Sequence, residues 1–268
     1  MEKGDARYIY CIIESTEDRK QKTENRKANE SINLGKIGVE NGEVYAIPYK
    51  DLNAVVHNCA PEPYKSEDKE QVKSWITAHE KVVETVWEKF GNVLPLGFDT
   101  IVKGDKKHNA DENLKNWLKE DYENLKKKLD KVKNKAEYGV QVSWDPKIIG
   151  EEIAKKDEEL KNLKEKIASL SKGLAYMYRQ KLEDMLKKEI EKEADRRFKD
   201  FYARINQHCD NIRIEKVKKI KAKQMLINLS CLVHKNKENE LGEELEKINN
   251  IEGFDVRFTG PWPPYSFA

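Results

Sequence analysis

The first apolar segment of the chain is Tyr8–Ile13, whose side chains are β-branched or aromatic on both faces. This pattern predicts a strand over 7–14 that is central in a sheet and covered on both sides. Two shorter apolar runs, at 43–47 and 54–57, predict further strands, and an Asn-Gly turn signal precedes the first of them. Residues 15–31 contain one Ala and no larger apolar side chain, so we expect a polar loop there.

Between 67 and 90, apolar residues recur at intervals of three and four, which predicts a helix. A short apolar run at 93–98 contains Pro95, so we expect an edge strand or an irregular strand there. The order strand, loop, strand, strand, helix, strand is that of a ferredoxin-like α+β unit whose first helix is shortened or replaced. We therefore predict an N-terminal ferredoxin-like domain over 1–109, which ends in a polar segment.

The remainder of the chain repeats this order with a longer helical part. The elements expected are a helix at 113–133, a strand at 137–144, long helices at 151–168 and 174–209, strands at 212–221 and 225–234, a helix at 239–250 and a strand at 255–258. A heptad frame fits the long helices, and its interruption at 169–173 favours an antiparallel hairpin over one continuous coiled coil. We predict a second modified ferredoxin-like domain over 110–268, with a helical-hairpin insertion at about 151–209 and a C-terminal tail at 259–268.

Composition narrows the class of protein. The length of 268 residues fits two domains. Charged residues make up 37% of the chain, against roughly 25% in an average globular protein, yet the net charge is only +2. This balance argues against a strongly cationic nucleic-acid binder. No apolar run reaches the length of a membrane span or of the core of a secretory signal. The four cysteines are sparse, so we expect free thiols in a reducing cytoplasm.

The C-terminal tail has an unusual composition. Residues 258–268 contain three prolines, one Trp, one Tyr and two Phe. The prolines restrain the backbone, so the segment cannot form a helix or a central strand. A stiff, aromatic tail is expected to dock, either on its own domain or partly on another chain.

Catalytic and metal chemistry find little support. Cys231 and His234, with the neighbouring pair His208 and Cys209, could supply zinc ligands, but adjacent residues point to opposite sides of most elements. His79 lies on the apolar face of its helix and is better explained as a hydrogen-bonded histidine at the edge of the core than as a general base. No nucleophile motif or phosphate-binding loop is present. We predict no catalytic residue, no metal and no cofactor.

Two basic runs, at 126–135 and 216–223, are diluted by nearby Asp and Glu. The second run alternates Ile and Lys, which fits a strand with a solvated Lys face. We therefore expect no nucleic-acid partner and no membrane partner.

Four segments of the chain resemble the gas vesicle protein F/L family (GvpF/GvpL). The most specific segment is the tail, Phe258-Thr-Gly-Pro-Trp-Pro-Pro-Tyr-Ser-Phe267. The others are Tyr8–Ile13, the region that begins with His79-Glu-x-Val-Val and ends with Val93-Leu-Pro-Leu-x-Phe-x-Thr100, and Gly173-Leu-Ala-Tyr-Met-Tyr-Arg-Gln-Lys181. One departure is Gly97-Phe98-Asp99-Thr100, where the family usually has Arg-Phe-Gly-Thr.

The resemblance implies two α+β domains of modified ferredoxin type and a non-enzymatic, cytoplasmic role in gas vesicle assembly. It implies a minor vesicle component that binds the small hydrophobic shell protein GvpA, prevents its aggregation during nucleation and contacts other accessory Gvp proteins. It also associates an F-type member with the gas-facing side of the shell. We take the ridge 174–205 as a candidate contact surface. The individual candidates for partner binding are Trp262, Tyr265, Phe267, Phe198 and Phe201. The alternative is a coiled-coil scaffold that links accessory proteins without contacting the shell protein.

Overall fold

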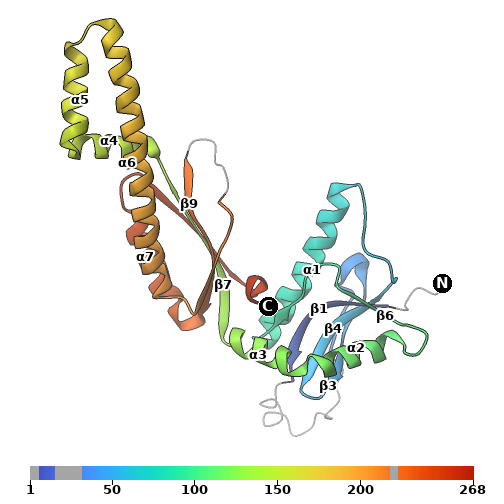
Figure 1. Ribbon diagram of the computed structural model, residues 1–268. Helices are drawn as coiled ribbons and strands as arrows, with labels where there is room; N and C mark the ends of the chain where they lie inside the picture. Colours follow the sequence, from blue (N-terminus) through green and yellow to red (C-terminus); the bar gives the residue numbers. More distant parts are fainter. Residues whose placement is uncertain (1–5, 16–31, 218–222) are drawn as a thin grey trace. The chain divides into compact units, whose positions relative to one another are not determined.

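The computed structural model describes residues 6–15, 32–217 and 223–268 (Figure 1). The polar segment 16–31, expected as a loop, lies outside this part of the chain. The described chain forms two compact units with a mixed α/β fold and antiparallel sheets. The first unit extends to Glu137 and also includes Pro261–Ala268, and the second is Tyr138–Gly260. This division differs from the boundary expected at 109/110, because the helices after 109 pack on the first sheet.

The first unit is built on a sheet with the strand order β2-β3-β4-β1-β5, and β6 also pairs with β1. The strands are β1 (Ala6–Glu14), β2 (Asn33–Gly35), β3 (Val44–Tyr49), β4 (Leu52–Cys59), β5 (Leu94–Pro95) and β6 (Ile101–Lys103). The prediction that β1 is central and buried on both faces is confirmed, since Tyr8 and Ile9 point into different clusters and are both buried. A register shift between Ile9 and Cys11 marks an irregularity in its pairing with β4.

Helices cover both faces of this sheet. On one face lies α1 (Lys69–Phe90), which begins at the N-cap Asp68 and ends at Gly91 with φ of 78°. On the other lie α2 (Ala110–Glu120) and α3 (Tyr122–Val132). The single helix expected at 113–133 is therefore two helices, which meet at Asp121. Their leucines complete the core cluster on this face of the sheet, which also contains Ile9: Leu114, Leu118, Leu125 and Leu129.

The second unit contains a four-stranded sheet with the order β10-β7-β9-β8. Its strands are β7 (Lys135–Trp144), β8 (Asn211–Ile214), β9 (Gln224–His234) and β10 (Phe254–Trp262), and α7 (Glu238–Asn249) lies between β9 and β10 in sequence. The strand expected at 212–221 is thus short, and its last four residues lie outside the described chain. The final strand is longer than the expected 255–258, and Pro261 fits in it because β10 is an edge strand.

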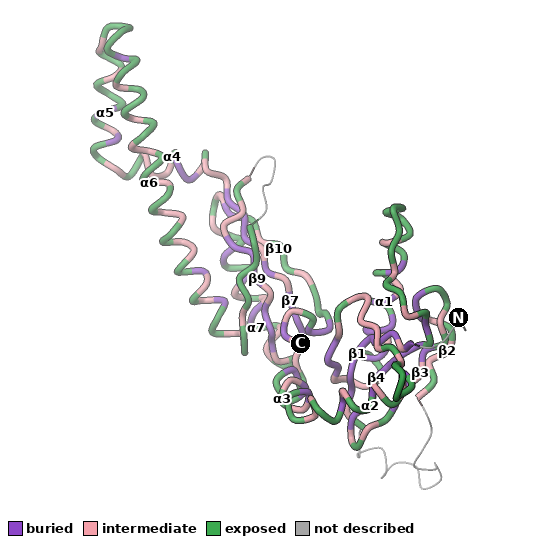
Figure 2. The backbone as a smooth tube through the Cα atoms, turned by 45° about the vertical axis from the view of Figure 1, so that its right-hand side comes forward, coloured by how far each residue is buried: buried purple, intermediate pink, exposed green. Residues whose placement is uncertain are grey.

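Three helices connect β7 to β8. They are α4 (Pro146–Lys156), α5 (Glu158–Ser169) and α6 (Lys172–Asn206). Each of the first two is capped by an aspartate, since Asp145 accepts from Lys147 N at 2.9 Å and Asp157 accepts from Leu160 N at 3.0 Å. α5 lies antiparallel to the N-terminal half of α6, and the residues of this hairpin are mostly exposed (Figures 1 and 2). The C-terminal half of α6 packs on β9 and α7.

Candidate partner-binding surfaces

The C-terminal segment is fastened to the first unit. Ser266 donates its backbone N–H and its hydroxyl to the two carboxylate oxygens of Glu137, at 2.7 and 2.5 Å. The Phe267 ring is 4% exposed, and the Lys131 ammonium lies 5.7 Å from its centroid. Ala268 packs against the cluster that contains Leu129. The segment therefore docks on its own chain, on the unit that holds the N-terminal sheet.

Only part of this segment is available to a partner. Trp262 is 47% exposed and Tyr265 is 37% exposed, whereas Phe267 is a core residue. Pro263 and Pro264 are buried between them. Burial of the Tyr265 hydroxyl raises its pKa, so only part of this ring faces solvent. The segment thus presents Trp262 and part of Tyr265 and uses Phe267 for its own attachment.

Phe198 and Phe201 on α6 also differ in burial. Phe201 is completely buried and meets Phe254 of β10 edge to face, with 5.1 Å between ring centroids. Phe198 is half-buried and stacks on Tyr202. Phe201 therefore belongs to the core of the second unit, and Phe198 retains some accessible surface.

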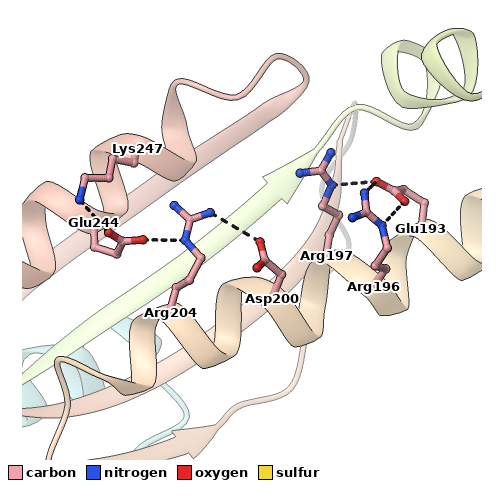
Figure 3. A network of polar contacts seen from close by, with 7 residues as sticks. All are labelled: Glu193, Arg196, Arg197, Asp200, Arg204, Glu244 and Lys247. Atoms are coloured by element: carbon pink, nitrogen blue, oxygen red, sulfur yellow. Dashed lines mark hydrogen bonds and ion pairs between the residues drawn. The ribbon is translucent and has the colours of Figure 1, made fainter.

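The same stretch of α6 is electrostatically satisfied (Figure 3). Glu193 accepts from Arg196 and Arg197, and these contacts lower the pKa of its carboxyl. Arg204 contacts Asp200 and donates from Nε to Glu244 of α7 at 2.6 Å. This network fixes α6 on α7 and has a structural role.

The tip of the α5–α6 hairpin, in contrast, exposes large apolar side chains. Leu174, Tyr176 and Met177 are 51%, 62% and 66% exposed, although they are large apolar side chains within one helical turn. Residues 161–181 around them contain six basic side chains and one acidic one. Leu174 and Met177, three positions apart, share one side of the helix, and Tyr176 lies on another side. Large apolar side chains exposed together at one helix end indicate a site of protein contact. Within the ridge 174–205, the tip is therefore the exposed end.

Two histidines lie in the core of the first unit. His79 is 2% exposed; its Nε2 faces the Leu96 carbonyl at 3.1 Å, and its Nδ1 lies 2.9 Å from the Tyr8 hydroxyl. A carbonyl only accepts, so Nε2 carries the proton and Tyr8 donates to Nδ1. His57 is 1% exposed and contacts the hydroxyls of Tyr10 and Tyr64. The prediction that His79 is hydrogen-bonded is confirmed, and its ring lies inside the core rather than at the expected edge.

Burial lowers the pKa of both His57 and His79 to about 4. The two rings are therefore neutral near pH 7 and form part of a buried tyrosine–histidine network. Each hydroxyl at its centre also accepts a backbone N–H, from Asp99 to Tyr8 at 3.0 Å and from Val39 to Tyr10 at 2.8 Å. These hydrogen bonds give both histidines a structural role in the core of the first unit.

Within the described chain, no three His, Cys, Asp or Glu residues are arranged as a metal site. All four cysteines are free thiols, and Cys231 is buried in β9. Among the helices in the same ranges, none is long and apolar enough to cross a membrane.

Comparison with known proteins decides the family. The family model described as gas vesicle synthesis protein GvpL/GvpF matches residues 6–268. The chain belongs to this family. It is 29% identical to gas vesicle protein L1 of Halobacterium salinarum, over 99% of this chain and 91% of that protein. It is 25% identical to gas vesicle protein L of Haloferax mediterranei, over 98% and 88% of the two chains.

Solved GvpF structures share the fold. The GvpF of Anabaena sp. PCC7120 superposes with a TM-score of 0.71 at 18% identity, and the GvpF of Microcystis aeruginosa with 0.62 at 17%. Each match covers 98% of both chains. The fold is therefore shared over nearly the full length of this chain and of the two GvpF chains.

The structure explains one departure from the usual family sequence. Asp99 stands where the family usually has Gly, and its φ is +68°, a left-handed conformation that Gly, Asn and Asp tolerate best. Its carboxylate accepts the Tyr64 N–H at 3.0 Å. The aspartate thus replaces glycine at a position that requires positive φ and adds a bond to the loop before α1.

Proposed function

We propose that this protein is a non-enzymatic assembly factor of gas vesicles and a minor vesicle component, which binds the small hydrophobic shell protein GvpA in the cytoplasm. By covering an apolar face of GvpA, it prevents aggregation while the vesicle nucleates. The protein then stays with the vesicle, on the gas-facing side of the shell. Membership of the gas vesicle synthesis family supports the process.

The observation that carries the proposed contact is the exposed cluster of Leu174, Tyr176 and Met177. It lies at the end of a long, solvated hairpin, away from the core of the second unit's own sheet. When a partner covers large apolar side chains, the free energy of binding becomes more favourable by about 25 cal/mol for each Å² of apolar surface removed from water. Trp262 and Tyr265 provide a second, smaller aromatic surface.

The decisive experiment replaces the cluster by serine. The triple variant Leu174→Ser, Tyr176→Ser and Met177→Ser is compared with wild type in a pull-down with purified GvpA and in a light-scattering assay of GvpA aggregation. We expect GvpA binding to weaken by at least about tenfold, which corresponds to about 1.4 kcal/mol, and aggregation to proceed as without the protein.

A matched control changes three exposed polar residues of the same helix: Lys187→Ser, Lys188→Ser and Glu191→Ser. This control should bind GvpA as wild type does, and circular dichroism should show both variants equally helical. Undiminished GvpA binding by the cluster variant would refute the proposed contact surface.

A second candidate function is a scaffold that links other accessory Gvp proteins through the helical hairpin, without direct contact with GvpA. The solvated, charged character of α5 and α6 supports it. A pull-down with GvpA alone separates the two functions, because the scaffold retains GvpA only when accessory proteins are added.

We also propose that both units are variants of the ferredoxin-like fold. In the second unit, the order of elements is strand, helices, strand, strand, helix, strand, and the spatial order is β10-β7-β9-β8. In the first unit, β3-β4-β1-β5 follows the same spatial order with β2 added at the edge. Both orders support the ferredoxin-like arrangement of strands.

A further inference from the structure

A groove lies where α4, α5 and α6 meet in the second unit. Its volume is about 570 Å³, within the range of about 300–1,000 Å³ typical of ligand-binding clefts. Small or apolar residues from the three helices form the floor: Gly150, Ala154, Leu160, Leu182 and Leu186.

A small residue on α4 lets this helix pack closely on α6 at the floor. A Cβ atom at Gly150 would lie 3.2 Å from Cδ1 of Ile190 and 3.8 Å from Cδ2 of Leu186, so α4 approaches α6 closely at this point. Leu160 is 1% exposed at the base, whereas Leu182 and Leu186 are only half-buried. The floor thus offers apolar surface that the chain itself leaves partly uncovered.

The rim of the groove is basic. Lys147, Lys155 and Lys164 line it together with a single acid, Glu151. Across the described residues, none of these three lysines has an ion-pair partner, although neighbouring Lys156 and Lys161 pair with Glu152 and Glu158. Further along α6, by contrast, charged side chains such as Arg196 and Arg204 are paired with carboxylates (Figure 3). The rim cations are therefore available to carboxylates from outside.

We propose that this groove binds an amphipathic helix of a partner protein, whose apolar stripe is flanked by Asp and Glu. Apolar side chains at positions i, i+3 or i+4, and i+7 would contact the floor, and the flanking carboxylates would pair with the rim lysines. The α4 side of the groove, from Pro146 to Lys155, spans about 15 Å, which matches about three helical turns. The site is distinct from the exposed cluster at the hairpin tip and does not depend on GvpA binding there.

The shape of the site favours a protein helix over other anionic partners. Phosphates of a nucleic acid or of a lipid surface would reach the rim lysines but would leave the apolar floor in contact with water. A helix satisfies both parts of the site, because its side chains fill a concave apolar surface and its flanks carry charge.

The test uses a labelled peptide of about 15 residues, long enough to form a helix in a groove, with Leu at i, i+3, i+7 and i+10 and Glu on both flanks. Fluorescence anisotropy measures its binding to the full-length protein. We expect binding that weakens as salt rises from about 50 mM to about 500 mM, and at least about tenfold weaker binding of a peptide with Lys in place of Glu.

Variants locate the site. Lys155→Glu with Lys164→Glu should reduce affinity for the acidic peptide by at least about tenfold, and Ala154→Leu, which fills the floor, should reduce it without changing charge. Lys188→Glu with Lys199→Glu changes the same number of exposed lysines outside the groove and should have less than about a twofold effect. The serine variant of the hairpin tip should bind the peptide normally.

Three results would overturn the proposal. The first is equal binding of the acidic and basic peptides, and the second is unchanged binding by the groove variants. The third is that phosphatidylglycerol vesicles or duplex DNA bind the wild type, lose binding in Lys155→Glu with Lys164→Glu, and compete away the peptide, which would assign the basic rim to an anionic surface.

Discussion

Tyr8 joins three parts of the first unit through one hydroxyl group. The hydroxyl oxygen accepts the Asp99 N–H, and the hydroxyl proton is donated to Nδ1 of His79. The Tyr8 side chain is fully buried. Replacing Tyr8 by Phe leaves a backbone donor and a ring nitrogen without a partner. Tyr8→Phe should therefore lower the free energy of unfolding by about 1–3 kcal/mol, measured by urea denaturation.

Tyr45→Phe is the matched control, because Tyr45 donates to Asn58 in an exposed bond. Its free energy of unfolding should change by less than about 0.5 kcal/mol. Equal effects of the two substitutions would show that the buried network contributes nothing specific.

His57 and His79 predict a pH dependence of stability. Their folded pKa of about 4 lies below the ordinary value of 6.5, so the unfolded chain binds protons that the folded chain does not. Stability is therefore fully present above pH 6.5 and falls as the pH decreases from 6.5 to about 4. The loss should amount to about 3 kcal/mol for each histidine, measured as the urea midpoint against pH.

The double variant His57→Gln with His79→Gln separates this effect from that of the carboxylates. It should be less stable at pH 7 but should show a flatter dependence between pH 6.5 and 4. Glu193 and Glu244, whose pKa values are lowered by arginine contacts, lose their contribution only at more acidic pH. A slope as steep as in wild type would rule out the histidines as its source.

Burial of individual aromatic residues could not be predicted from their type. Phe201 and Phe267 are core residues, whereas Tyr176 and Trp262 are exposed. On α6, charged residues surround the apolar ones along the whole helix, so the pattern alone does not distinguish the end that contacts a sheet from the end that contacts only α5. That distinction depends on tertiary packing.

At the scale of elements, strong hydrophobic periodicity was sufficient to predict a helix or a strand. The period of three and four predicted α1, and the alternation at 137–144 predicted β7. The short strands β2 and β6 have three residues each, and too few positions to show a period. They form because β1 and β3 offer unpaired backbone groups at those points. Periodicity also could not predict the break at Asp121 between α2 and α3.

The junction of α4 and α5 provides a prediction about one helix end. Asp157 caps α5 by accepting the Leu160 N–H, whereas Ser171, in the same position before α6, makes no side-chain cap bond. Asp157→Ala should lower the stability of the hairpin by about 1 kcal/mol, and Ser171→Ala should change it little. Hydrogen exchange of the amides in α5 is the appropriate measurement, and faster exchange in both variants would contradict the capping argument.

For the whole molecule, the sequence predicted two successive α+β units and a docked, proline-rich end, but not that residues 261–268 belong with the first unit. Nothing in the local pattern of the tail identifies its acceptor. The partner is Glu137, a buried carboxylate that lies 129 positions earlier in the chain and takes both bonds from Ser266. Such a pairing becomes visible only when distant segments are placed together.

This attachment separates a structural role of the tail from a role in partner binding. Phe267→Ala removes a ring that is 4% exposed and should lower the free energy of unfolding by about 3–5 kcal/mol. Trp262→Ala and Tyr265→Ala remove partly exposed rings, and each should cost less than about 1.5 kcal/mol. If Trp262 and Tyr265 contribute to GvpA binding, their double alanine variant remains folded and binds GvpA more weakly than wild type. A well-folded Phe267→Ala variant would contradict the packing described here, and undiminished GvpA binding by the double variant would confine the contact to the hairpin tip.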